Sequence, residues 1–174
     1  MTIGRIIGRV IVVLGMTGLF SPVFGAGNEE LHTRATELMG KAAESMAAGD
    51  TAGVEPMYAA TGTIAAKAPE DIYLARIHGG LGAWLSVTYG SKGDYAKAFE
   101  RYGDLKTIGK RFPDSLPLAA GIAQTAATLY PLFRMANWGD EAAVLRADVK
   151  ALTERWKEDA IVRTAWEQIE AETP

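Results

Sequence analysis

The dipeptide Gly-Asp recurs along the chain at nearly regular intervals, and no other feature constrains the fold as strongly. Three copies are separated by 44 and 46 residues: Gly49-Asp50, Gly93-Asp94 and Gly139-Asp140. A fourth copy, Gly103-Asp104, lies outside this spacing. Between consecutive copies a proline precedes an acidic residue, at Pro69-Glu70 and Pro113-Asp114. Gly favours the left-handed backbone that ends a helix, and Asp caps the next helix. Each interval therefore predicts a unit of turn, helix, acidic turn and helix.

Apolar residues from Asn28 onward follow the three- and four-residue spacing of amphipathic helices. No segment alternates with period two for long enough to predict a strand. One helix pair cannot cover its own apolar face and must stack on a similar pair. The sequence thus predicts an all-α fold of stacked antiparallel helical hairpins, a short solenoid of about three units. We expect helices over these segments: 28–48, 55–67, 71–89, 94–112, 115–137, 140–156 and 159–169.

Acidic and hydroxyl residues lie where these helices should begin. Asp71, Asp94 and Asp159 are expected N-caps, and either Asp114 or Ser115 should cap the fifth helix. Two prolines fall within expected helices. Pro56 should be tolerated in a first turn, whereas Pro131 predicts a kink or an early stop near Tyr130.

The first 25 residues predict a secretory signal peptide. Arg5 and Arg9 precede a short apolar stretch, Pro22 interrupts it, and small residues follow at Gly25. The stretch is shorter than the roughly 20 residues that cross a membrane, which argues against a retained anchor. We expect cleavage after Gly25, or after Ala26 or Gly27. Residues 26–174 would then form a single helical-repeat domain, periplasmic or secreted, without stable membrane insertion.

Composition excludes several classes of partner and site. The chain has 18 Lys and Arg against 21 Asp and Glu, a formal net charge of −3, which becomes −5 without Arg5 and Arg9. An acidic chain argues against nucleic acid as the main partner. The absence of cysteine excludes disulfides, thiolate metal sites, covalent haem attachment and a lipidated cysteine.

One stretch resembles the tetratricopeptide repeat. Its core positions follow the order of that family over residues 85–102, where a Gly-Asp-Tyr turn joins two helices: Leu85, Tyr89, Gly93, Asp94, Tyr95, Ala98 and Tyr102. The flanking units place Val54 and Val144 where the family prefers Ala, and the interval exceeds the family's roughly 34 residues. The resemblance implies a concave surface, lined by the first helix of each pair, that holds a protein or peptide partner. It implies no catalysis.

The segment around residues 73–84 is the candidate binding site. Its three glycines within one helix, Gly79, Gly80 and Gly82, cost roughly 1 kcal/mol each relative to alanine. Close helix packing or a local break is one explanation. The other is a groove with an aromatic and cationic rim, for which the candidate ligand-binding residues are Tyr73, Arg76, His78 and Trp84.

No catalytic or metal motif accompanies this segment. His32 and His78 are the only histidines and lie in different expected helices, so we expect no metal site and no cofactor. His-Gly-Gly lacks the Gly-x-Ser-x-Gly element that a hydrolase requires. The mixed charges of the fourth helix predict a solvated face: Lys97, Glu100, Arg101 and Asp104.

Three functions remain open. The first is an exported scaffold that binds a protein or peptide in the cell envelope. The second is a small-ligand-binding helical bundle with its pocket at residues 73–84. An enzyme of unknown class is the third, disfavoured because nucleophile, base and metal motifs are all missing.

Overall fold

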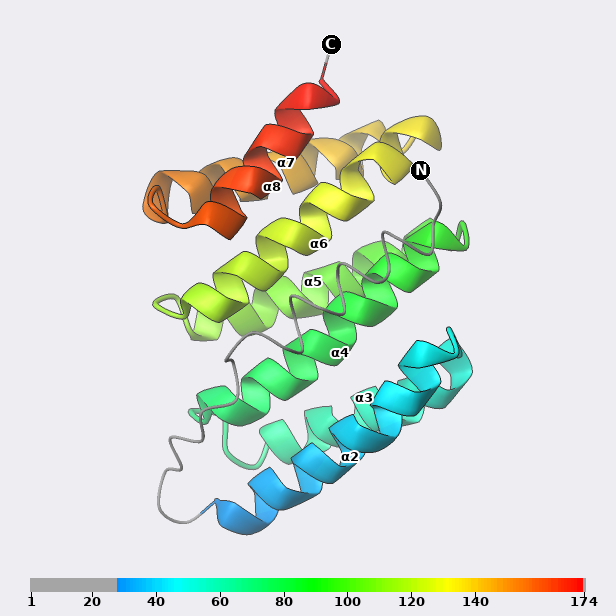
Figure 1. Ribbon diagram of the computed structural model, residues 1–174, viewed down its shortest axis with the longest axis vertical. Helices are drawn as coiled ribbons and strands as arrows, with labels where there is room; N and C mark the ends of the chain where they lie inside the picture. Colours follow the sequence, from blue (N-terminus) through cyan, green and yellow to red (C-terminus); the bar gives the residue numbers. More distant parts are fainter. Residues whose placement is uncertain (1–27, 174) are drawn as a thin grey trace.

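The chain folds into α-helices throughout the part that its computed structural model describes, residues 28–173. These residues contain seven helices and no strand, which confirms the all-α prediction (Figure 1). The predicted signal peptide, residues 1–25, lies outside the described residues. The helices are α2 (Glu29–Ala47), α3 (Thr51–Ala65), α4 (Ile72–Ser91), α5 (Tyr95–Arg111), α6 (Leu116–Met135), α7 (Gly139–Arg155) and α8 (Ala160–Ala171).

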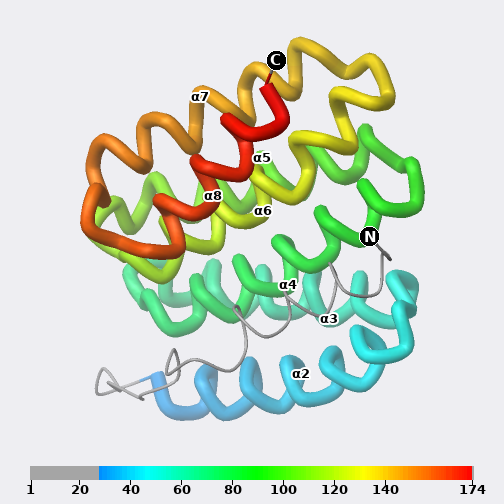
Figure 2. Tube along the Cα trace, turned by 45° about the horizontal axis from the view of Figure 1, so that its top comes forward, coloured from blue at the N-terminus to red at the C-terminus, as the bar shows by residue number. Residues whose placement is uncertain are grey.

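The helices form two layers. Figure 1 shows α2, α4, α6 and α8 side by side in front, with α3, α5 and α7 behind them. Helices next to one another in sequence pack together, and α4 also contacts α2 and α6. The tube in Figure 2 follows this back-and-forth path from α2 to the C-terminus. As a result α4 and α6 are enclosed by neighbours on several sides, and most of their residues are buried.

The turns between paired helices fall at intervals of 44 residues. Among residues 28–173, positive φ is found at Gly49 (69°), Gly93 (83°) and Asn137 (63°). The prediction that Gly139 makes the third turn is wrong, because Gly139 is the first residue of α7. Asn is among the few residues with a side chain that adopt this left-handed conformation readily. The second interval is therefore 44 residues, not 46.

With an interval of 44 residues, the residue of the third unit that corresponds to Ala98 is no longer Val144. The position 44 residues after Ala98 is Ala142, whose exposed fraction is 3%. Val144, expected at this place, is 37% exposed. The third unit therefore has the small buried residue at this position, whereas the first unit has the buried Val54.

Capping follows the same interval. The Asp71 side chain accepts hydrogen bonds from the backbone N–H groups of the first turn of α4, and Asp159 does the same for α8. Asp94 caps α5 as predicted, and of the two candidates for α6 it is Ser115 that caps. The caps at 71, 115 and 159 are separated by 44 residues each. The predicted early stop at Tyr130 is wrong, because α6 continues to Met135.

The second helix also differs from prediction. It begins at Thr51 rather than near residue 55, so Pro56 lies inside α3 and not in its first turn.

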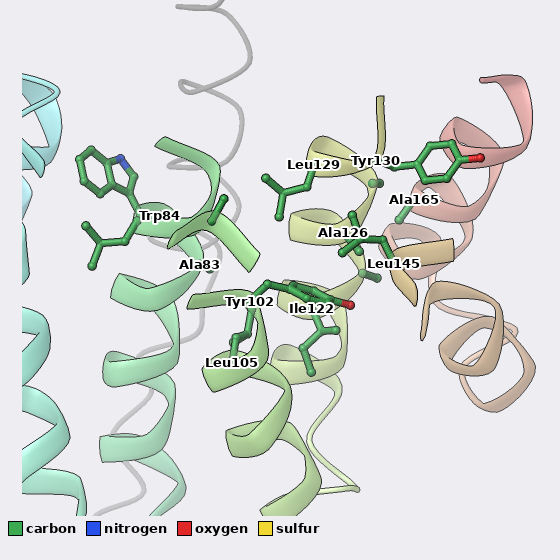
Figure 3. Packing of buried hydrophobic residues seen from close by; sticks show 14 of the residues in the cluster. Ala83, Trp84, Tyr102, Leu105, Ile122, Ala126, Leu129, Tyr130, Leu145 and Ala165 are labelled. Carbon is green, nitrogen blue, oxygen red and sulfur yellow. The ribbon is translucent and has the colours of Figure 1, made fainter. Parts of the chain in front are cut away.

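A continuous apolar cluster runs from α2 to α8. Figure 3 shows its centre, where side chains of α5, α6 and α7 meet: Tyr102, Leu105, Ile122, Ala126, Leu129 and Leu145. Each helix therefore buries its apolar face against more than one neighbour. That shared burial is the main source of stability in a chain without disulfides.

Buried tyrosine hydroxyls join one helix pair to the next. Tyr58 donates a hydrogen bond to Asp104, and Tyr102 donates one to Asp148, each at 2.8 Å. Both donor and acceptor are displaced by 44 residues between the two bonds. Burial, together with the neighbouring Asp148 carboxylate, raises the pKa of Tyr102 well above its usual value.

The charged face of α5 is not wholly solvated, which corrects the sequence-based expectation. The Arg101 side chain is 19% exposed and forms ion pairs with Glu55 of α3 and with Asp104. Its guanidinium also lies 4.8 Å from the centre of the Tyr58 ring. These contacts hold α5 against α3.

We expect the third turn to depend on Asn137 and not on Gly139. Asn137→Ala should lower the free energy of unfolding by about 1–2 kcal/mol, because alanine is strained at positive φ. Gly139→Ala should raise it by up to about 1 kcal/mol, since a Cβ there meets nothing within 4 Å and the unfolded chain loses freedom. Urea unfolding followed by circular dichroism measures both. The opposite order of effects would show that the turn is assigned to the wrong residue.

Tyr102→Phe should lower the free energy of unfolding by about 1–2 kcal/mol at neutral pH, because the hydrogen bond to a carboxylate is lost. It should also weaken the alkaline loss of stability. As pH rises through about 10, the unfolded phenol ionises while folded Tyr102 keeps its proton, so the unfolded state binds fewer protons and stability falls. Denaturant unfolding from pH 8 to 11 tests this. Parallel curves for the two proteins would contradict it.

Candidate functional site

Helix α4 carries all four side chains that the sequence singled out, and the structure separates them into two groups. At about 100° per residue, Tyr73, Arg76 and Trp84 project within about 80° of one another, whereas His78 points roughly 140° away from Tyr73. The structure therefore brings three of the predicted residues to one side of α4 and does not bring His78 to it. Gly80 lies in the same sector as the three.

His78 packs between helices. Its ring stacks on Tyr58 of α3 with centroids 4.3 Å apart, and its Nδ1 lies 3.2 Å from the Thr61 hydroxyl. Burial lowers the pKa of His78 below its usual value. These contacts assign it to the α3–α4 interface, apart from the other predicted residues.

Tyr73 lies in the first turn of α4, and Trp84 lies eleven residues further along the same side of the helix. The Tyr73 hydroxyl is 2.8 Å from that of Thr36, and its ring centroid lies 4.8 Å from that of His32, both on α2. The prediction that Trp84 lies on a rim is wrong, because its exposed fraction is 1%. Figure 3 shows its ring reaching from α4 toward the N-terminal helices.

The glycines of α4 have different roles. A Cβ on Gly79 would lie 3.2 Å from Leu105, and one on Gly82 would lie 3.1 Å from the Tyr58 ring, so both allow α4 to approach its neighbours. Close packing therefore explains these two, and the helix is unbroken. A Cβ on Gly80 would meet nothing within 4 Å. Gly80 instead leaves space beside Arg76.

Four buried polar atoms near this sector have no hydrogen-bond partner among residues 28–173. They are Arg76 Nε, Trp84 Nε1, Thr88 Oγ1 and Gln124 Oε1. Three belong to α4. Gln124 lies on the adjacent α6, where it occupies the position of Gly80 on α4, 44 residues earlier. A buried polar group without a partner costs about 1–3 kcal/mol, so such groups are rare in native proteins and call for a physical reason.

Arg76 also lacks a charged partner. No carboxylate of residues 28–173 lies within 4.0 Å of its guanidinium, and burial lowers its pKa. Arg76 and Gln124 are partly exposed, whereas Trp84 and Thr88 lie deeper. We call the partly exposed surface of Arg76, Gly80 and Gln124, together with the buried Trp84 and Thr88 of α4, the α4–α6 face. It combines a cation that has no ion pair with donors and acceptors that have no hydrogen-bond partner.

Thr88 and Gln124 were missed from the sequence. Both stand in apolar stretches that predict core helix. Thr88 lies on α4 itself, twelve residues beyond Arg76, and the packing of α6 on α4 brings the helix of Gln124 next to it. Among the described helices, α6 alone is long and apolar enough to cross a membrane. Most of α6 is buried by the other helices.

Within residues 28–173 there is no group of three or more His, Asp or Glu side chains that could hold a metal ion. His32 forms a 2.6 Å contact with the Asp71 carboxylate and so joins α2 to the start of α4.

Comparisons with protein-family models, with curated proteins and with solved structures found no match.

His78→Gln should weaken the acid loss of stability without affecting the α4–α6 face. Because burial lowers the pKa of folded His78, the unfolded state binds more protons as pH falls below about 6.5, and stability falls with it. Urea unfolding between pH 7.5 and 5 measures the slope. Identical slopes in the two proteins would mean that His78 is solvated and not packed against Tyr58.

Proposed function

We propose that the protein is an exported, tetratricopeptide-like helical-repeat scaffold that binds an extended protein or peptide segment on the α4–α6 face. The observation that carries this proposal is the set of unpaired polar atoms on that face: Arg76 Nε, Trp84 Nε1, Thr88 Oγ1 and Gln124 Oε1. A bound segment would supply partners to the partly exposed Arg76 and Gln124 directly, and to Trp84 and Thr88, each 1% exposed, through a shift of the side chains that cover them. It would thereby recover the free energy that the isolation of these groups costs.

The repeat part of the proposal rests on the 44-residue interval. Turn residues, helix caps and the tyrosine–aspartate bonds all recur at it. Ala98 and Ala142 supply the small buried residue where the paired helices approach. Three such units, with α8 against the last, form the proposed short solenoid.

The spacing of the unpaired groups suits a peptide. Twelve residues separate Arg76 from Thr88, about 18 Å along a helix. An extended chain rises about 3.3 Å per residue, so roughly five to six peptide residues would cover this distance. Peptide backbone offers both donors and acceptors, which matches the mixture on the face. Arg76 adds a preference for an acidic side chain.

The proposed place of action is the cell envelope or the exterior. This part rests on the predicted signal peptide, residues 1–25, and the absence of cysteine is compatible with it.

A small anionic ligand is a second candidate for the same face. The space beside Gly80 favours it, because a compact ligand could lie there with its charge against Arg76. Such a ligand would not need Thr88, two turns further along α4. The two candidates therefore differ in their dependence on Thr88.

Selection from a random heptapeptide library tests the peptide proposal. Recovered peptides should be enriched in Asp or Glu at one position, and Arg76→Gln should weaken their binding by tenfold or more, about 1.4 kcal/mol. Arg34→Gln on α2 is the matched control, since Arg34 is exposed and has no ion pair among the described residues. It should leave affinity unchanged.

Thr88→Val separates the two candidates. A peptide should lose affinity by a few-fold, whereas a compact anion should bind unchanged. Peptides that show no acidic preference and bind Arg76→Gln as tightly as the unaltered protein would contradict the assignment of the face.

A further inference from the structure

A hollow lies between α5, α6 and α7, and none of its lining residues belongs to the α4–α6 face. It has a volume of about 340 Å³, at the lower end of the range of small-molecule pockets, which is roughly 300–1,000 Å³. The residues that define its chemistry are Lys106, Lys110, Phe112, Ile122, Leu152 and Arg155. None of them belongs to the site proposed above.

The floor of the hollow is apolar. Phe112 follows α5, Ile122 comes from α6 and Leu152 from α7. Small residues, Ala119 and Ala151, also line it and keep it open. Buried apolar surface of this kind favours an aliphatic occupant over a hydrated ion.

The rim of the hollow is cationic although the whole chain is acidic. Lys106, Lys110 and Arg155 line it, against a single lining carboxylate, that of Asp148. Asp148 is already engaged, since Lys106 lies 2.6 Å from it and Tyr102 donates a hydrogen bond to it. Arg155 pairs with the exposed Asp114.

Lys110 is the cation that a ligand would engage first. It is exposed, and no carboxylate of residues 28–173 lies within 4.0 Å of its ammonium group. The hollow lies at the N-terminus of α6 and also at the C-termini of α5 and α7, so the helix dipoles oppose one another there and the side-chain cations set the sign of the charge. The unpaired cation therefore favours a ligand with a negatively charged group. The apolar floor favours a ligand whose other end is a hydrocarbon chain.

The corresponding place one unit earlier is built differently. At the same 44-residue offset, Gly62 and Ala66 replace Lys106 and Lys110, and His78 replaces Ile122. There the His78 ring packs so closely that a Cβ on Gly62 would lie 2.9 Å from its Cε1. The cationic rim and apolar floor therefore belong to one junction and are not a general consequence of the fold.

We propose that this hollow binds an aliphatic monocarboxylate, with the carboxylate at Lys110 and the tail against Phe112, Ile122 and Leu152. The ligand is a free carboxylate and not the end of a peptide. The proposal is independent of peptide binding on the α4–α6 face.

Isothermal titration of the full chain with octanoate tests the proposal. We expect one site, no detectable binding of acetate, and affinity that rises by about fourfold per added methylene from butanoate to octanoate. Octanol and octylamine should bind at least tenfold more weakly than octanoate. Equal binding of octanol, or tighter binding of acetyl-leucine than of octanoate, would overturn the proposal.

Two pairs of variants locate the site. Lys110→Glu should weaken octanoate binding by tenfold or more, whereas Lys41→Glu, an equal charge change at an exposed position of α2, should not. Ala151→Trp should block the mouth of the hollow. Ala143→Trp is its control, because Ala143 is also an exposed alanine of α7 but does not line the hollow.

Circular dichroism melting of each variant establishes that it is folded. Unchanged octanoate affinity in either Lys110→Glu or Ala151→Trp would overturn the assignment. Binding of library-selected peptides to the α4–α6 face should persist in both variants, so failure of one proposal is distinguishable from failure of the other.

Discussion

Shared burial of apolar helix faces is the constraint on which the rest of this structure depends. Helices α4 and α6 contact neighbours in both layers, so nearly every side of them must be apolar or small. Gly79 and Gly82 are consequences of that enclosure, because larger residues would collide with Leu105 and Tyr58. Polar groups on such helices are costly unless paired. The unpaired atoms of Arg76 and Gln124 therefore point to a missing partner, whereas the same atoms on an exposed helix would simply be bonded to water.

The sequence predicted the helices well because their signals are local. Asp71, Asp94 and Asp159 cap helices where their positions before apolar runs indicated. The third turn was misassigned because the Gly-Asp dipeptide at Gly139 matched the pattern, while Asn137 offered a less conspicuous route to the same left-handed backbone. The stop expected at Pro131 failed because the packing of α6 outweighs one lost hydrogen bond.

The candidate sites were predictable only in part. Arg76 and Gly80 could be recognised because a cation and surplus glycines are unusual in a buried helix. Thr88 could not, because a threonine in an apolar helix is usually bonded to its own backbone, and Gln124 could not, because it comes near α4 only once α6 packs on that helix. The hollow between α5, α6 and α7 could not be predicted from the sequence, because Lys110, Ile122 and Leu152 come from three different helices. Both candidate sites depend on the packing of helices that are distant in sequence. Helical periodicity predicts the helices but not how they pack.

The recurrence of turns and helix caps at 44 residues is compatible with two proposed sites in one chain. The interval of 44 residues fixes the backbone at each junction, so a junction can differ in side chains without a change of fold. The junction between the first two units has the His78 ring packed against Gly62, whereas the next junction contains the hollow lined by Ile122, Lys106 and Lys110. Helix α6 contributes Gln124 to one site and Ile122 to the other, two residues apart and therefore on opposite sides of the helix. Because these two residues face different sides of α6, each proposed site can be altered by substitutions that do not touch the other.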